Sequence, residues 1–463
     1  MHDAHDASAH QSTTRETVNA DSSLLEALRG RRSRRFGTGM KMPSGPLAYQ
    51  SRFQPLPLTE EEEAALAYAA CGITGYALAD LCYERGQGGT IMAGLVGRTV
   101  ASGDGIQAVA LAITNDKATY LLKRPKDFTA SEIGTVIELA KEGCFTEIYR
   151  RSRVKIKDGR SAPPIEPLFN INANQWSAHA AGSTYFLPIN DLTFLYINGL
   201  LEVFNETTGA FLLDERANFQ PAGLGRFARS KGGHLEDDPA RGRLATIKHL
   251  ELMVAEFVTI EQGMMLQNLG LMTQALGLGG FPNFANHEFG WFQALGFRMN
   301  QMPASQYLGA NRLTALGMKL LRRDPLVPFP IGLETNGEAV LKPYCPPYYP
   351  SMAAAVRAVV ETKFGARGVF REKASHPWKE QETICSIIPD LSAAAIEATI
   401  AYCEYVWSRY GRFPVHLAPF RTVVGYQSCH LDLEFYDRFY HPDALTQTQR
   451  DDFARGQGGP KPH

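Results

Sequence analysis

The chain has 463 residues, of which 44% are hydrophobic and 21% are charged, so it can bury a large core and belongs with ordinary globular proteins. Lysine and arginine total 47 against 48 aspartate and glutamate, and the net charge of -1 excludes a bulk attraction to nucleic acid. Seven cysteines without a Cys-x-x-Cys pair favour reduced thiols, and no apolar stretch is long enough for a membrane span. We therefore expect a cytoplasmic protein with neither a nucleic-acid nor a membrane partner.

Two helices are expected at the start of the ordered chain, the first of them short. Ser22 or Ser23 caps an amphipathic helix that begins at Leu24 and runs into a cluster of arginines. Thr59 caps a second helix, predicted over residues 60–82, whose first turn carries glutamates that complement the helix dipole.

The middle of the chain contains a predicted hairpin and a long helix. Residues 106–114 are typical of a buried strand, and residues 118–122 would complete the hairpin. A helix is predicted over residues 247–276, with no internal proline and with Gly277 placed to end it. Its apolar face would carry Leu250, Val254, Phe257, Ile260, Met264, Leu271 and Ala275. Glycines recur every seventh residue, at Gly263, Gly270 and Gly277. This stripe allows another backbone to pack closely, or it makes room for a flat cofactor or for a dimer partner.

The C-terminal region is predicted to contain helices near residues 351–363 and 392–409, followed by an aromatic segment. Cys429, His430, Asp432 and Glu434 are possible metal ligands, because all four side-chain types bind cations. Their spacing is not that of a metal site, and the alternating apolar residues favour a half-exposed strand or lid, so no metal is expected.

Two segments carry candidate chemistry. Residues 29–36 place several guanidinium groups and the Ser33 hydroxyl directly after a helix, which suits a phosphate or carboxylate as well as it suits a solvated basic turn. Residues 277–284 form a glycine-rich link after the long helix, where the backbone either approaches a ligand or simply turns.

Together these segments resemble the nitroreductase family of FMN enzymes. Arg31-Arg32-Ser33-Arg34-Arg35-Phe36 is similar to the family's Arg-x-Ser-x-Arg segment, which grips the FMN phosphate. Residues 267–279 are similar to its Q-N-L-x-L-x-x-x-A-x-G-L-G helix and turn. Residues 98–107 resemble the Ser-Gly-rich segment that lines the flavin ring in the subgroup of azoline-oxidising dehydrogenases of peptide biosynthesis.

The resemblance implies a set of FMN-binding residues. The phosphate would be held by Arg31, Arg32 and Ser33, by Arg35 with Arg34 as its alternative, and by Arg312. The ring would lie against Ser102, Gly103 and Gln107, with the backbone of Pro282, Asn283 and Phe284 beside flavin N5. No catalytic acid or base is assigned, because that choice requires geometry.

The resemblance also implies the fold: an α+β, nitroreductase-like fold, in which a mixed or antiparallel sheet is flanked by helices and the helix 247–276 forms the core of a homodimer. The active site would then lie at the subunit interface. The expected organisation is a disordered tail (1–21), the FMN-binding domain (22–340) with an atypical insertion (125–245), a helical and aromatic extension (341–443) and a second disordered tail (444–463).

Three functions follow from these interpretations. The first is an FMN-dependent dehydrogenase or oxidase that acts on a small organic or peptide-derived substrate in specialised biosynthesis. The second is an NAD(P)H-dependent reductase of the nitroreductase type. The third is a non-catalytic flavin-fold scaffold that binds a peptide or partner protein through the aromatic C-terminal region.

Overall fold

The computed structural model describes residues 23–81, 89–284, 288–372, 376–422 and 424–457. The predicted tail over residues 1–21 lies outside the described residues. No helix within the described ranges is long and apolar enough to cross a bilayer.

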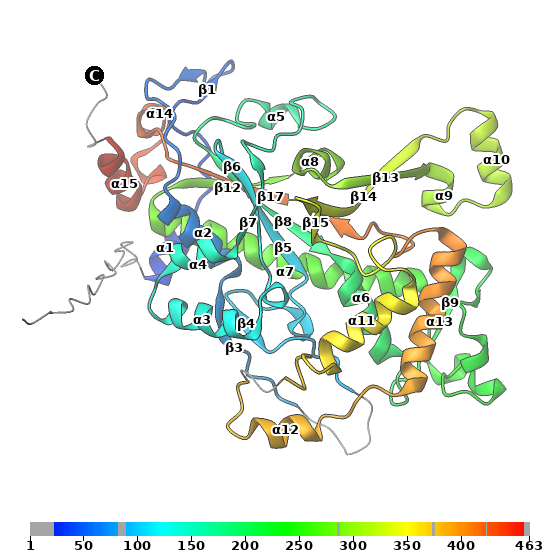
Figure 1. Cartoon of the computed structure of the whole chain (residues 1–463). Coiled ribbons are helices and arrows are strands. Elements are labelled where there is room, and N and C mark those ends of the chain that lie inside the picture. Colours follow the sequence, from blue (N-terminus) through cyan, green and yellow to red (C-terminus); the bar gives the residue numbers. More distant parts are fainter. Residues whose placement is uncertain (1–22, 82–88, 285–287, 373–375, 423, 458–463) are drawn as a thin grey trace, which may run out of the picture.

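An antiparallel sheet forms the centre of the molecule (Figure 1). Its strands lie in the order β12-β17-β8-β5-β6-β7, with the short strand β16 pairing to β8. Their bounds are β5 (Val109–Thr114), β6 (Ala118–Leu122), β7 (Arg153–Asp158), β8 (Thr184–Asp191), β12 (Gly279–Phe284), β16 (Phe420–Arg421) and β17 (Val424–Cys429). Every neighbouring pair is antiparallel, and the predicted hairpin is confirmed as β5 and β6.

Both faces of this sheet are covered. Along β5, Leu111 and Ile113 pack into one core cluster with the helices on one face, whereas Ala110 and Ala112 face a second cluster on the other side. This alternation follows from the two-residue period of a strand. Because both faces are buried, β5 is continuously apolar instead of alternating with polar residues.

Helix α7 (Ile247–Leu276) crosses the sheet and has the predicted bounds, with Thr246 at its N-cap and Gly277 in the left-handed conformation at its C-cap. The predicted apolar face is wrong in part: Phe257 is 50% exposed and Ile260 is 60% exposed. The helix instead buries several polar residues, because groups on the elements packed against it supply their hydrogen bonds. The buried polar residues are Glu251, Glu261, Gln262, Thr273 and Gln274.

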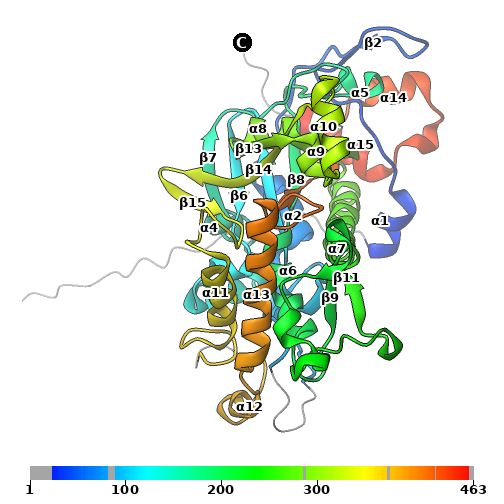
Figure 2. The same ribbon diagram turned by 90° about the vertical axis from the view of Figure 1, so that its right-hand side faces the viewer.

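A second core lies around the N-terminal half of α7 and is formed largely by helices. It contains α6 (Leu192–Val203), α11 (Met352–Phe364) and α13 (Ala393–Tyr410), with β9 (Phe211–Asp214), β10 (Gln220–Pro221) and β11 (Leu244–Thr246) beside them. The predicted helices near 351–363 and 392–409 are confirmed. Figure 2 shows α13 running down the front of this part of the molecule.

The remaining elements surround these two cores. They are α1 (Leu24–Gly30), β1 (Lys41–Met42), β2 (Tyr49–Gln50), α2 (Glu60–Cys71), β3 (Ile73–Tyr76), β4 (Val96–Arg98), α3 (Ala130–Lys141), α4 (Phe145–Ser152), α5 (Asn172–Gln175), α8 (Glu288–Leu295), β13 (Arg298–Pro303), α9 (Ala304–Leu308), α10 (Arg312–Leu320), β14 (Leu326–Thr335), β15 (Glu338–Leu341), α12 (Gln381–Ile387), α14 (Leu433–Phe439) and α15 (Gln447–Gln457). Strands β13 and β14 carry α9 and α10 away from the body of the molecule (Figure 1).

Three predictions about elements are corrected. The helix expected over residues 60–82 ends at Cys71, because Gly72 caps it and the chain continues as β3. The half-exposed strand or lid expected around residues 431–435 is the start of α14. The tail expected to be disordered from residue 444 contains α15, which packs against the C-terminal end of α7.

The expected domain boundaries also differ from the structure. Strand β17 comes from the predicted C-terminal extension, yet it lies inside the central sheet between β12 and β8. Strand β8 comes from the predicted insertion and pairs with β5. Both segments are therefore part of the central sheet, because strand order in a sheet does not follow order in the sequence.

Leu269 tests how far the packing of α7 stabilises the protein. Its side chain is fully buried between α2 and the sheet, so Leu269→Ala is expected to lower the free energy of unfolding by about 2–5 kcal/mol. Leu78→Ala is the matched control, since Leu78 is 89% exposed, and it should change stability by less than about 0.5 kcal/mol. Urea unfolding followed by circular dichroism measures both, and equal effects would contradict the packing described for α7.

Candidate functional site

The arginine segment crosses the edge of the central sheet beside β12. After α1 ends, an isolated antiparallel bridge joins Arg34 to Gly280, and a second joins Gly37 to Leu431. The N-terminal arginines and the glycine-rich link after α7, which are far apart in sequence, therefore meet in space. Arg34 and Arg35 are consecutive in this extended segment, so their side chains point to opposite sides.

Arg34 serves the fold. Its side chain is 3% exposed, and its guanidinium donates to the Ala444 carbonyl at 2.8 Å, to Gln274 Oε1 at 2.8 Å and to the Gly30 carbonyl at 3.2 Å. These bonds tie the end of α7 to the segment that leads into α15. Arg34 has few donors left for a ligand.

Arg35 retains a free donor on the opposite side. Its Nη2 donates to Asn174 Oδ1 at 2.7 Å and to Ser177 Oγ at 3.2 Å, and its guanidinium lies 4.3 Å from the Phe281 ring centroid. Its Nε is buried and has no hydrogen-bond partner among the described residues. Burial lowers the pKa of Arg35 from its usual value, yet a guanidinium stays charged in proteins. An incoming anion would satisfy this orphaned donor.

The preceding residues are exposed. Arg31 and Ser33 make no hydrogen bond or ion pair with any other described residue. Arg32 donates from Nη1 to the Asp443 carbonyl at 2.8 Å, beside an open groove of about 420 Å³ between α1 and the start of α15. Guanidinium groups and a hydroxyl are the donor types that suit the phosphate of FMN. The groove beside Arg32 is lined by Arg32 and Arg34, whereas Arg35 faces the other side of the segment.

The loop expected to line the flavin ring is fastened to α7. Ser102 Oγ donates to Glu261 Oε2 at 2.7 Å and accepts from the Gln107 backbone N–H at 2.8 Å. The Gln107 side chain donates to the Val96 carbonyl. The Ser102 and Gln107 side chains are therefore engaged within the protein. A ligand could therefore contact this loop through Gly103 and through backbone groups.

The segment expected beside flavin N5 lies in the edge strand β12. Pro282 pairs with Tyr426 and Asn283 with Gly425. Pro282 has no N–H, so of the three predicted residues only Asn283 and Phe284 carry an amide that could donate to a ring nitrogen. Asn283 Oδ1 also accepts from Asn174 Nδ2 at 3.3 Å, which links this strand to the residue that binds Arg35.

The two halves of the predicted site lie on opposite sides of α7 within one chain. Arg31 lies over Gly270, where an added methyl group would sit 3.8 Å from the Arg31 side chain. The ring loop is bonded to Glu261. These two positions are nine residues apart, which is two and a half turns at 3.6 residues per turn. One chain alone therefore does not bring the ring loop to the arginine segment.

Arg312 lies apart from the other predicted phosphate ligands. It is the first residue of α10, on the arm formed by β13 and β14, and it is exposed. Figure 1 shows α10 at the opposite end of the molecule from α1. Arg312 and Arg31 do not meet within one chain.

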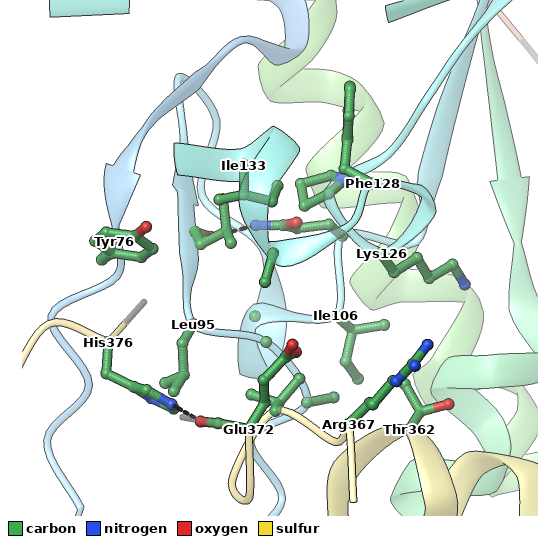
Figure 3. A pocket seen from close by; sticks show the side chains of 18 of the residues that line it. Tyr76, Leu95, Ile106, Lys126, Phe128, Ile133, Thr362, Arg367, Glu372 and His376 are labelled. Atoms are coloured by element: carbon green, nitrogen blue, oxygen red, sulfur yellow. Dashed lines mark hydrogen bonds between the residues drawn. The ribbon is translucent and has the colours of Figure 1, made fainter. Parts of the chain in front are cut away.

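A cavity of about 220 Å³ lies on the other side of the ring loop. Figure 3 shows its lining, with the Lys126 and Arg367 head groups on one side and Tyr76 and His376 on the other. Burial, together with nearby Arg124, lowers the pKa of Lys126 to about 8. Lys126 and Arg367 are absent from the predicted site, because only the fold brings them together. The run of charges at residues 123–127 after a buried strand was the available signal for Lys126.

His430 belongs to a charged cluster that joins three elements. Its Nε2 lies 3.2 Å from a Glu62 oxygen in α2, and its Nδ1 lies 3.1 Å from an Asp452 oxygen in α15. Burial alone would lower the pKa of His430, but the hydrogen bonds with Asp452 and Glu62 raise it to about 9. The two carboxylates use opposite nitrogens of the ring, so the cluster suits an imidazolium that fastens α15 to α2. The predicted candidates Asp432 and Glu434 do not belong to it.

Comparison of the chain with known protein families finds no match, and comparison with curated proteins finds none either. Among solved structures, the chain is similar to a "putative nitroreductase" from Ralstonia eutropha JMP134, at 10% sequence identity and a TM-score of 0.28, over 60% of this chain and 77% of that chain. A TM-score this low carries no argument about the cofactor or the reaction. The class that the structure itself defines is a helix-flanked antiparallel α/β protein.

The His430 cluster predicts a pH-dependent stability. Because the pKa of His430 is raised from 6.5 to about 9, its stabilisation is complete below pH 6.5 and is lost as the pH rises through about 9. The loss should reach up to about 3 kcal/mol. Urea unfolding at several pH values should show this decline for the wild type and a flatter profile for His430→Gln. His441→Gln, at an exposed histidine, is the control; parallel profiles for wild type and His430→Gln would contradict the assignment.

Proposed function

We propose that this protein is an FMN-dependent oxidoreductase of the nitroreductase type. One observation carries the proposal: the two segments that resemble the family's FMN-binding blocks meet in the fold. Arg34 pairs with Gly280, and the Arg35 guanidinium stacks on Phe281. If the arginine segment were only a solvated basic turn, nothing would require it to contact the glycine-rich link that follows α7.

The phosphate of FMN would be held by Arg31, Arg32, Ser33 and Arg35. Arg35 is favoured over Arg34 because it keeps an unpaired buried donor, whereas Arg34 spends its donors on the fold. Asn283 and Phe284 are consecutive in β12, so their N–H groups point to opposite edges of the strand, and the one that faces away from β17 would orient the ring. Bound FMN supplies hydride-transfer chemistry, and the protein supplies position and charge.

We infer that the site is completed by a second copy of the chain. Beside the ring loop and N-terminal to it along the helix, the exposed side of α7 carries a stripe of large apolar residues: Leu252, Met253, Phe257 and Ile260. At Gly263, which follows in the same stripe, an added methyl group would meet nothing within 4 Å. A two-fold axis across the stripe would bury it and would bring the ring loop of each subunit to the arginine segment of the other.

The reaction we favour is the oxidation of a small organic or peptide-derived substrate, by a dehydrogenase or oxidase of specialised biosynthesis. Its support is the resemblance of the loop at residues 98–107 to the azoline-oxidising subgroup, together with the cavity of mixed apolar and charged lining that the same loop borders. Reduction by NAD(P)H is the competing reaction. The two differ in what reduces the bound flavin.

FMN retention tests the proposed cofactor. The purified protein should keep FMN after excess is removed, with flavin absorption bands. Arg31→Met and Arg35→Met should each weaken FMN binding about 10- to 100-fold, since each removes a charge-assisted hydrogen bond to phosphate. Arg241→Met, at an exposed arginine, should leave binding unchanged.

The same sample distinguishes the alternative functions. Anaerobic bleaching of the flavin bands by NADH or NADPH would assign a reductase, and retained flavin that bleaches only with an organic substrate would assign a dehydrogenase. A correctly folded protein that never retains FMN would overturn the cofactor assignment and favour the scaffold.

Ile260 tests the proposed dimer. Ile260→Glu places a charge in the α7 stripe and is expected to convert a dimer to a monomer in sedimentation velocity and to lower FMN retention at least tenfold. Ile387→Glu is the matched control, because Ile260 and Ile387 are both 60% exposed but Ile387 lies on α12. A wild-type monomer, or a dimer that persists in Ile260→Glu, would contradict this interface.

A further inference from the structure

The cavity beside the ring loop is assembled from parts of the chain that are distant in sequence. Gly94 to Val96 lead into β4, residues 105–107 form the end of the ring loop, residues 125–128 precede α3, and Thr362 and Arg367 come from α11 and the turn after it. Its volume is about 220 Å³. A cavity of roughly 150 Å³ accommodates benzene, so this one has room for a single ring with one or two substituents.

Much of the wall is apolar. Leu95, Ile106, Ile133 and Phe194 are all buried, and Phe128 adds a second aromatic ring to the lining. Several of these side chains surround the middle of the cavity in Figure 3. A flat hydrocarbon body would gain burial against them.

One end of the cavity carries an ammonium group with unused donors. The Lys126 side chain is 18% exposed, and its buried Nζ has no hydrogen-bond partner among the described residues. Its nearest charge is an Asp191 oxygen at 3.7 Å, well beyond a charge-assisted hydrogen bond, and that oxygen accepts from Arg124 at 2.8 Å. The ammonium also lies over the rings of Phe194 and Tyr344, 4.5 Å and 5.4 Å from their centroids. These contacts supply no hydrogen bond, so a ligand oxygen would add the acceptor that the buried ammonium lacks.

A second cation lies at the same end. The Arg367 side chain projects to the same side as Lys126 in Figure 3. It is exposed, and within the described part of the chain it forms no ion pair or hydrogen bond. Asp191 contributes negative charge at this end, and the Glu372 side chain points into the middle of the cavity in Figure 3, so the cavity suits one negative charge better than the two of a phosphate monoester.

We propose that this cavity binds a small aromatic carboxylate. The carboxylate accepts hydrogen bonds from Lys126 and Arg367, and the ring lies between Leu95, Ile106 and Phe128. The inference stands without the proposed flavin, because it rests on the cavity and its two cations alone. Where the flavin is also bound, the shared loop at residues 102–107 would place this carboxylate next to the flavin site as a substrate.

Calorimetric titration of the purified full chain tests the proposal, with benzoate as probe and benzamide as its neutral counterpart of equal shape. Benzoate should bind at least tenfold more tightly than benzamide. Lys126→Met and Arg367→Gln should each weaken benzoate binding at least fivefold. They should also reduce the ratio of the benzoate affinity to the benzamide affinity. Lys117→Met and Arg357→Gln are the matched controls, since both residues are exposed and each variant removes a charge of the same type outside the cavity lining.

Equal affinity for benzoate and benzamide would overturn the proposal, and so would no binding of benzoate or unchanged binding in both cavity variants. Arg367 is exposed, so its variant remains informative if Lys126→Met fails to fold, which circular dichroism would show. Titrations with and without added FMN separate the two proposals. Benzoate binding by a protein that never retains FMN would support this site and contradict only the flavin.

Discussion

The buried carboxylate of Glu261 is the interaction on which the rest of the site region depends. It receives the Arg98 guanidinium, the Ser102 hydroxyl and, at 3.1 Å, the Val109 backbone N–H, and both members of the Glu261–Arg98 pair are almost fully enclosed. Charges enclosed in this way are stable only when they are paired and hydrogen-bonded. One side chain of α7 thus holds the end of β4, the loop that follows it and the start of β5, and so shapes both the ring loop and one wall of the cavity.

Helix α7 has an unusual distribution of polarity. It turns Glu251 and Glu261 inward, where backbone N–H groups and Arg98 satisfy them, and turns Phe257 and Ile260 outward. In an isolated chain, exposure of these apolar side chains to water costs free energy. A second copy of the chain that covers the stripe would remove this cost. The same geometry explains why the ring loop and the arginines lie on opposite sides of the helix in one chain and can form a common site only across an interface.

The cations of the two candidate sites are held in different ways. Arg31 and Arg32 lie at the surface, where they can bind an anion that stays partly in contact with water. Lys126 lies inside a largely apolar wall, where a ligand must also replace water. Arg34 serves the fold instead of a ligand, since its hydrogen bonds join the N-terminal segment to Gln274 at the end of α7 and to Ala444 before α15. Adjacent arginines in one sequence motif therefore have separate roles.

Local sequence signals determined the elements whose patterns are strong: α7 with its Thr246 and Gly277 caps, the β5 and β6 hairpin, and the helices α11 and α13. They also led to the prediction that the arginine segment and the link after α7 belong to one site, and in the structure the two segments meet at the Arg34–Gly280 bridge. Only the tertiary structure decided which arginine is free, which face of α7 is buried, that β17 enters the central sheet and that Lys126 and Arg367 meet at one cavity. The physical reason is that caps and hydrophobic periods act over a few residues, whereas burial and pairing depend on partners brought from distant parts of the chain.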